Sequence, residues 1–140
     1  MKTLDAWLDE YAESHQNPVN KTIHWICVPL ITFSVLGIFW ALSPWVAVAF
    51  TAVAGAFYVR LSLPLALGML VLAAAMLAII SVLPHPFWTS MVIFALAWVG
   101  QFYGHYVQGK KPSFFKDLEF LLVGPIWLLN FVYQRVGIKA

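Results

Sequence analysis

Two long runs without any charged side chain dominate the sequence. No Asp, Glu, Lys or Arg occurs in the 38 residues between Lys21 and Arg60, or in the 49 residues between Arg60 and Lys110. Together the two runs make up 87 of the 140 residues. A helix of about 20 residues crosses the hydrocarbon core of a bilayer, so each run is long enough for two crossings. The sequence therefore predicts a polytopic membrane protein.

The composition excludes several other classes of protein. Hydrophobic residues make up 62% of the chain and charged residues 10%, whereas about 25% of an average soluble domain is charged. The formal net charge of +2 gives no reason to expect a nucleic-acid partner. The single cysteine, Cys27, excludes an internal disulfide and CxxC chemistry. We expect one membrane domain over residues 1–140.

Turn residues divide the uncharged runs into helices. Ser43-Pro44, Arg60 and Pro84-His85-Pro86 mark the breaks. They predict an all-α transmembrane helix bundle whose four spans cover about 21–42, 44–59, 63–83 and 87–107.

Two further segments flank the four spans. Residues 3–14 have the apolar spacing of an amphipathic helix, which either lies on the membrane surface or docks on the bundle. An apolar segment at about 118–134 contains Gly124-Pro125. It predicts either a kinked fifth span or a re-entrant pair.

The order of the crossings gives the bundle an orientation. If the first span begins on one side, the basic residues near the span ends all fall on that side: Lys21, Arg60, Lys110, Lys111 and Lys116. Cytoplasmic loops carry the excess of Lys and Arg. We therefore expect this side to face the cytoplasm.

The same count separates the four histidines. It places His15, His24 and His105 at the cytoplasmic level and His85 at the opposite end. Several neutral imidazoles at one depth favour a metal site. The alternative is that each histidine is a hydrogen-bonded or snorkelling polar residue. No HExxH or GxSxG motif is present, so neither a common zinc protease nor a nucleophile-elbow hydrolase is expected.

Polar neighbours accompany the proposed metal site. Gln101 and Gln108 share a helical face with His105. Gln101, Asn17 and Asn20 are candidates for accepting a hydrogen bond from a metal-bound imidazole. For Asn20 we favour the simpler role of N-cap of the first span.

Other residues near this level have simple alternative roles. Lys21, Lys110 and Lys111 are candidates for holding a carboxylate or phosphate head group, although the positive-inside bias also explains them. Cys27 follows His24 by one turn, and we expect it to be a small buried hydrophobe.

Two stretches of the chain carry a resemblance to a known family. The first is Tyr11-Ala-Glu-Ser-His15-Gln-Asn17-Pro18-Val-Asn20-Lys-Thr-Ile-His24. The second is Trp98-Val-Gly-Gln101-Phe-Tyr-Gly104-His105, followed by Lys111-Pro112 and Gly124-Pro125. In order and spacing they resemble the signatures of the Mpo1-like family, formerly a domain of unknown function.

The resemblance implies an enzyme of lipid metabolism. It implies a multi-pass protein of the bacterial inner membrane, or of the endoplasmic reticulum in a eukaryote. The implied activity is that of an Fe(II)-dependent dioxygenase, which uses O₂ to cleave the C1–C2 bond of a 2-hydroxy fatty acid. The product of this α-oxidation is a fatty acid shorter by one carbon. The implied iron ligands and catalytic residues are His15, His24 and His105.

One difference from the family concerns the ligand set. Relatives often carry Glu a short way after the last histidine, where this chain has Gln108. If that Glu is a ligand in a site of two histidines and one carboxylate, Gln108 does not replace it, and Glu13 or Asp117 is the alternative source of a carboxylate. A three-histidine site would not depend on it. The alternative function is a non-enzymatic lipid-binding or scaffold protein. A solute carrier is disfavoured because the polar groups cluster at one side of the membrane.

Overall fold

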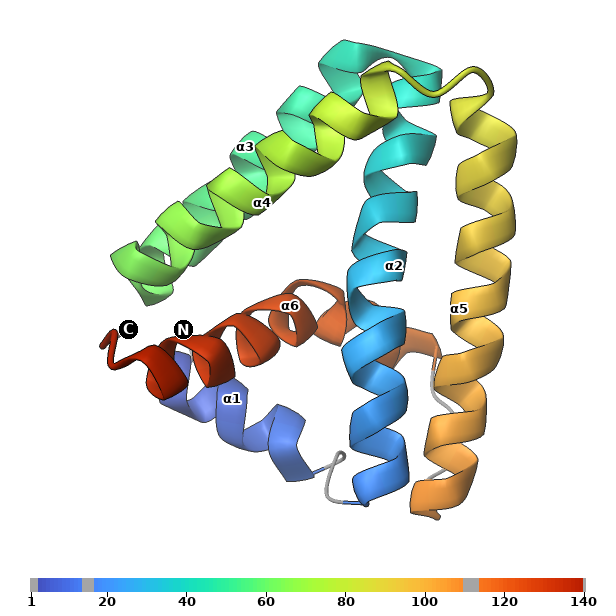
Figure 1. Cartoon of the computed structure of the whole chain (residues 1–140). Coiled ribbons are helices and arrows are strands. Elements are labelled where there is room, and N and C mark those ends of the chain that lie inside the picture. Colours follow the sequence, from blue (N-terminus) through green and yellow to red (C-terminus); the bar gives the residue numbers. More distant parts are fainter. Residues whose placement is uncertain (1–2, 14–16, 110–113, 140) are drawn as a thin grey trace.

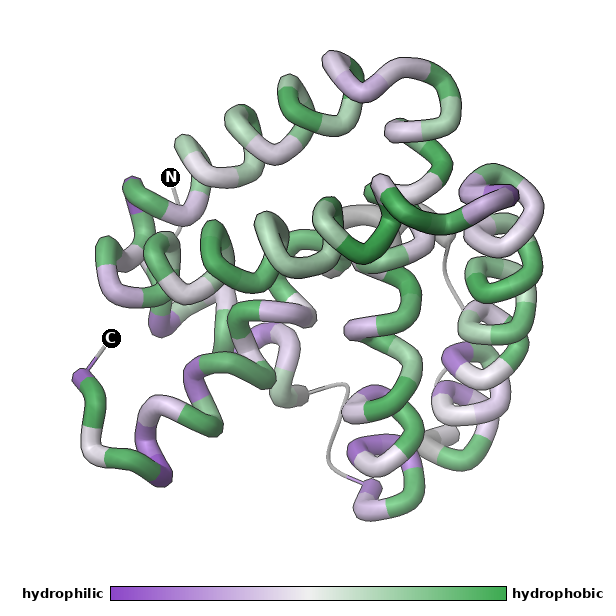
Figure 2. The backbone as a smooth tube through the Cα atoms, turned by 45° about the horizontal axis from the view of Figure 1, so that its top comes forward, coloured by the Kyte–Doolittle hydropathy of each residue, from purple (hydrophilic) through white to green (hydrophobic). Residues whose placement is uncertain are grey.

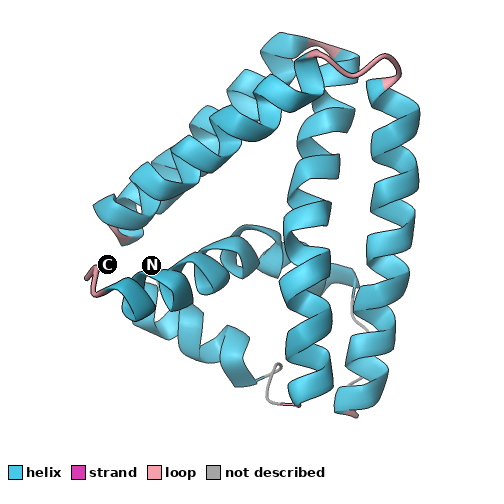
Figure 3. Ribbon diagram, in the orientation of Figure 1, coloured by secondary structure: helices cyan, strands magenta, loops and turns pink. Residues whose placement is uncertain are grey.

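The described part of the fold consists of α-helices. The computed structural model describes residues 3–13, 17–109 and 114–139, and this part of the chain holds no strand (Figure 3). The helices are α1 (Leu4–Glu13), α2 (Pro18–Leu42), α3 (Pro44–Leu61), α4 (Leu63–Ser81), α5 (Pro86–Gln108) and α6 (Phe114–Val136). The predicted all-α bundle is confirmed.

Four of these helices have the length and composition of membrane spans. They are α2, α3, α4 and α5, whereas the apolar part of α6, Leu121–Val136, is shorter. The four begin and end within three residues of the predicted spans. In Figure 2 the same helices are largely apolar along their length, and the most hydrophilic segments lie near helix ends. The chain is thus a membrane protein with four long apolar helices.

The first residues of α2 correct one prediction. Asn17 is the N-cap, because its side chain accepts hydrogen bonds from the N–H groups of Val19 (2.9 Å) and Asn20 (3.4 Å). Pro18 takes the first helical position, where its missing N–H costs nothing. The prediction that Asn20 caps the helix is therefore wrong. Asn20 lies within the first turn of α2 and is fully buried.

Serine residues make the tight turns between the spans. The Ser43 N–H donates to the Phe39 carbonyl at the end of α2, and its hydroxyl accepts from the Trp45 N–H at the start of α3. Ser62 links α3 to α4 in the same way. Backbone groups at the ends of apolar helices are thus satisfied locally, as a low-dielectric surrounding requires.

The turns also fix which helix ends meet. The α2–α3 and α4–α5 turns lie together at the top of Figure 1, and the start of α2 and the end of α5 lie together at the bottom. For α2 and α5 this arrangement agrees with the prediction that the first span begins at the level where the fourth ends. It brings Asn20 and His24 to the same end of the bundle as His105.

The helices α2 and α5 pack closely because glycines face the partner helix. A Cβ atom at Gly100 would lie 2.6 Å from Cys27 Sγ, and one at Gly104 would collide with Asn20 Oδ1. Gly100 and Gly104 form a GxxxG spacing, which lets helix backbones approach each other in lipid. The site at the end of these helices therefore rests on a close backbone contact.

The N-terminal helix docks on the bundle. Leu8 of α1 packs in one cluster with Ile126 of α6, and Tyr11 packs in another with Val123. Of the two roles expected for the amphipathic helix, the structure supports docking. In Figure 1, α1 and α6 lie together and run across the direction of α2 and α5.

The last helix passes through Gly124-Pro125 without interruption. Pro125 has no N–H to donate within the helix. The nearby carbonyl of Leu122 accepts a hydrogen bond of 2.7 Å from the Tyr58 hydroxyl of α3. The carbonyl that the missing N–H leaves without its intrahelical donor is that of Leu121, four residues earlier. The segment is nevertheless a single helix rather than a re-entrant pair, and the Tyr58 hydrogen bond ties it to α3.

Candidate functional site

Two of the predicted histidines meet between α2 and α5. The ring centres of His24 and His105 are 5.5 Å apart, and the ring planes are inclined by 72°. Their side chains are 1% and 7% exposed. Buried ionisable groups in a membrane protein are functional candidates because they are costly to keep there.

A backbone hydrogen bond orients the ring of His24. Its Nδ1 atom lies 2.9 Å from the carbonyl oxygen of Asn20, one turn earlier in α2. A carbonyl oxygen only accepts hydrogen bonds, so Nδ1 is the donor in this contact, and in the neutral imidazole the lone pair is then on Nε2. Metal-bound histidines commonly use this arrangement, in which the second nitrogen is fixed by an oxygen partner. Asn20 therefore contributes through its backbone oxygen.

Each histidine of the pair follows a residue with an amide side chain by four positions, Asn20 in α2 and Gln101 in α5. The Asn20 side chain is fully buried against Gly104. Gln101 precedes His105 by one helical turn and is 9% exposed. Its Oε1 atom is buried and has no hydrogen-bond partner among the described residues. A buried amide oxygen of this kind is suited to accept a hydrogen bond from a ligand.

Tyr11 lies beside His24 and packs in turn against Gly124. The Tyr11 ring lies edge-on to the His24 ring, with centres 6.4 Å apart. A Cβ atom at Gly124 would lie 3.0 Å from the Tyr11 hydroxyl and 3.2 Å from Val28 Cγ1. The sequence reasoning gave neither Tyr11 nor Gly124 a role in the site. The available signal was their presence in the two family-like stretches.

Cys27 has the packing role expected from the sequence. It is buried in a cluster with Ile31, Ala97 and Trp98. Its sulfur lies against Gly100. Cys27 therefore helps to pair α2 with α5.

The remaining predicted residues are distributed as follows. Asn17 caps α2, and Lys21 is exposed on its first turn. His85 is exposed just before α5, and twenty residues of helix place it about 30 Å from His105. His85 thus lies apart from the pair, as the crossing count predicted.

Part of the expected site falls outside the described residues. This applies to His15, Lys110 and Lys111 and to the side chain of Gln108. Within the ranges 3–13, 17–109 and 114–139, no group of three or more His, Cys, Asp and Glu side chains gathers as a metal site would. The described part of the site is therefore a histidine pair with polar and aromatic neighbours.

A comparison with known protein families matches both sequence stretches that contribute residues to this site. A family model described as "2-hydroxy-palmitic acid dioxygenase Mpo1-like" matches residues 1–59 and 66–136. The chain belongs to the Mpo1-like family. His24, His105 and Gln101 all lie within the matched residues, as do Tyr11 and Gly124.

A curated relative supports the same assignment. The Mpo1-like chain is 30% identical over 142 aligned residues to the 2-hydroxy-palmitic acid dioxygenase MPO1 of Saccharomyces cerevisiae. The alignment covers 96% of this chain and 82% of the yeast protein. No solved structure matches the chain.

Proposed function

We propose that this protein is an Fe(II)-dependent dioxygenase that shortens 2-hydroxy fatty acids by one carbon. The observation that carries the proposal is the buried pair of His24 and His105, which lies within a chain of the Mpo1-like family. The yeast relative is a 2-hydroxy-palmitic acid dioxygenase by name. An apolar bundle with a polar site at one end suits a substrate with a carboxylate head and a hydrocarbon tail.

The described histidine pair would supply two ligands to an iron ion. Imidazole is a suitable ligand for iron as well as for zinc and copper. Nitrogen ligands lie about 2.0–2.1 Å from a bound metal, so rings whose centres are 5.5 Å apart are close enough to share one ion. The Nδ1–H of His24 donates to a backbone carbonyl, so in the neutral ring Nε2 carries the lone pair that a metal ligand needs. We propose His15 as a third ligand from its place in the first sequence stretch.

The chain's own residues would bind and orient the substrate. The Oε1 atom of Gln101 is available to accept a hydrogen bond from the C2 hydroxyl of the substrate. The lysines predicted for this side, Lys21 with Lys110 and Lys111, would attract its carboxylate. When bound, Fe(II) would supply the means of activating O₂. One O₂ converts a 2-hydroxy acid into the shorter acid, CO₂ and water, which balances without a further reductant.

The direct test is turnover by purified protein loaded with Fe(II). The substrate is 2-hydroxypalmitate carrying an isotopic label at C1. We expect O₂ consumption, formation of pentadecanoate and release of the label as CO₂. Absence of turnover by iron-loaded protein would refute the proposal. A lipid-binding or scaffold protein would hold the same amount of iron in the wild type and in His105→Ala.

A further inference from the structure

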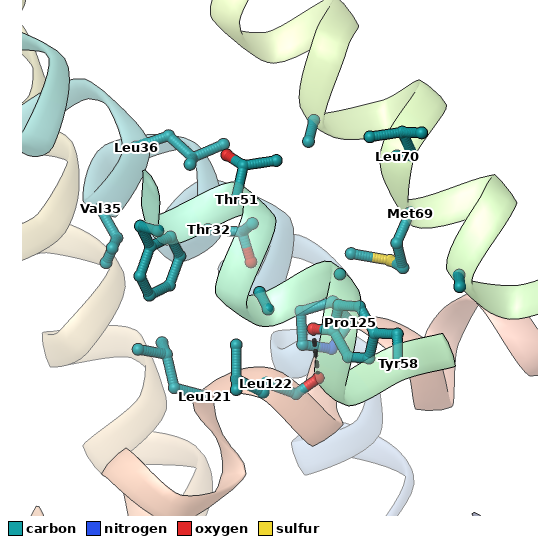
Figure 4. A pocket seen from close by; sticks show the side chains of 15 residues that line it. Thr32, Val35, Leu36, Thr51, Tyr58, Met69, Leu70, Leu121, Leu122 and Pro125 are labelled. Atoms are coloured by element: carbon teal, nitrogen blue, oxygen red, sulfur yellow. Dashed lines mark hydrogen bonds between the residues drawn. The ribbon is translucent and has the colours of Figure 1, made fainter. Parts of the chain in front are cut away.

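A cavity lies in the bundle beyond the histidine pair. Its volume is about 60 Å³, and it is bounded by α2, α3, α4 and α6 (Figure 4). The side chains that enclose it include Leu36, Thr51, Tyr58, Met69, Leu121 and Pro125. Leu70 also lines the cavity and is 56% exposed, so the cavity opens toward the surroundings of the bundle on the side of α4.

The lining of the cavity is suited to hydrocarbon. It contains no charged side chain. Its three hydroxyl groups donate to backbone carbonyls: Thr32 to Val28 (3.0 Å), Thr51 to Ala47 (2.9 Å) and Tyr58 to Leu122 (2.7 Å). Their protons are therefore already used, and a polar ligand would find few donors here.

One face of α2 leads from the histidine pair to the cavity. His24, Val28 and Thr32 follow each other at intervals of four residues, so they lie on the same face of the helix. Thr32 lines the cavity, and eight residues of helix place it about 12 Å from His24 along the axis.

The helix α6 connects the same two places. Leu121 and Pro125 line the cavity, and Gly124 between them lies against Val28 and the Tyr11 hydroxyl. The Tyr11 ring in turn faces His24. The histidine pair and the cavity therefore share two walls, and Val28 with Gly124 separates them.

We infer that the cavity receives the acyl chain of the substrate and contributes to selection by chain length. This inference rests on the proposed function, because the head of the same substrate would lie at the histidine pair. A volume of about 60 Å³ is less than half of the roughly 150 Å³ of an engineered apolar cavity that binds one benzene molecule. The cavity thus encloses a short part of the chain, and the rest lies toward the opening beside Leu70.

Gly55 offers a way to fill the cavity without disturbing the helices. It lines the cavity, and a Cβ atom built on it meets no other atom within 4 Å. Ala56, the next residue of α3, is exposed and does not line the cavity. Gly55→Leu and Ala56→Leu therefore form a matched pair, in which only the first variant adds atoms to the cavity.

The first experiment measures chain-length preference. For Gly55→Leu we expect the ratio of kcat/KM for 2-hydroxypalmitate to that for 2-hydroxylaurate to fall about tenfold, because one methylene group in an apolar pocket is worth about that much. The ratio should be unchanged in Ala56→Leu. An unchanged ratio in Gly55→Leu, or the same change in both variants, would overturn the inference.

The second experiment locates the chain without requiring turnover. The probe is 2-hydroxypalmitate with a photoreactive diazirine in its tail, and the labelled residues are mapped by mass spectrometry in the full-length protein. We expect labels on residues that line the cavity, fewer of them in Gly55→Leu, and no loss in Ala56→Leu. Equal labelling of the exposed faces in both variants, or equal cavity labelling by a phospholipid with the same diazirine, would contradict the inference. Cavity labelling by the probe in an iron-loaded protein without turnover would instead refute the proposed reaction.

Discussion

The pair α2 and α5 and the hairpin of α3 and α4 are built on different principles, although both consist of long apolar helices. The first pair is held by close glycine contacts and buries His24, Asn20 and His105 between its helices. The hairpin instead buries apolar side chains such as Ala66 and Met69, and a Cβ atom at its Gly55 would meet nothing within 4 Å. In lipid, apolar surface gains little from leaving its surroundings, so close packing and polar contacts decide which helices stay together.

This difference suggests a division of roles. The pair α2 and α5 fixes the relative position of polar groups, which catalysis requires to within fractions of an ångström. The hairpin forms an apolar wall around a cavity, where shape matters more than exact position. Substitutions in the first region should therefore impair chemistry, whereas those in the second should change stability or substrate preference.

The largest effect is expected from removing one histidine of the pair. His105→Ala should lower bound iron and reduce turnover of 2-hydroxypalmitate by at least about a hundredfold, since even the outer partners of metal ligands contribute 10–100-fold. Iron per protein and O₂ consumption are the measurements. His85→Ala, at the opposite end of α5, is the control and should keep both. Equal loss in the two variants would remove the distinction between the ends of the bundle.

Glycine substitutions test the close packing directly. Gly104→Ala should destabilise the protein by about 1–3 kcal/mol, because the added Cβ collides with Asn20 in a closely packed region. Gly55→Ala in the hairpin is the matched control. Its Cβ meets nothing within 4 Å, so helix propensity should make it neutral or more stable by up to about 1 kcal/mol.

For Gly104→Ala and Gly55→Ala the measurement is the free energy of unfolding in mixed detergent micelles. Iron binding provides a second reading, since Gly104→Ala should also displace Asn20, whose carbonyl fixes His24. Similar stability of the two alanine variants would show that the α2–α5 contact is as tolerant as the hairpin.

The buried amide of Gln101 allows stability and function to be separated. Replacing it with Leu removes a buried oxygen that has no partner in the described structure. The free energy of unfolding should therefore stay the same or rise, because an unsatisfied buried polar group costs about 1–3 kcal/mol. The kcat/KM for 2-hydroxypalmitate should fall about tenfold or more if the oxygen holds the substrate hydroxyl. Full activity in Gln101→Leu would show that Gln101 does not bind the substrate hydroxyl.

The sequence predicted the features of the fold that depend on local composition. Uncharged runs and turn residues located the four spans to within three residues. The order of crossings placed His24 at the level of His105 and His85 at the other end. The contact between His24 and His105 and the position of His85 just before α5 agree with this.

Features that depend on contacts between distant helices were not predicted. Asn17 and Asn20 are both plausible caps by residue type, and only the start of α2 at Pro18 decides between them. The contact of Tyr11 with Gly124 joins α1 to α6, and periodicity within one helix carries no information about it. The cavity likewise depends on how α3 and α4 pack against α2 and α6.

The smallest effect is expected from the hydrogen bonds that tie the hairpin to α6. The Tyr58 hydroxyl donates to the Leu122 carbonyl (2.7 Å), and the Tyr133 hydroxyl of α6 donates to the Pro64 carbonyl (2.8 Å). Tyr58→Phe and Tyr133→Phe should each lower the free energy of unfolding by about 0.6 kcal/mol, the average for side-chain hydrogen bonds between membrane helices.

Two features of Tyr58 make its variant the more informative of the two. Its partner carbonyl lies beside Pro125 in α6, and its side chain lines the cavity. If the hairpin only shapes the cavity, Tyr58→Phe should keep iron binding and turnover while slightly changing chain-length preference, and Tyr133→Phe should change neither. A loss of iron in Tyr58→Phe would show that the apolar hairpin also positions the histidine pair, and the division between the two regions would then fail.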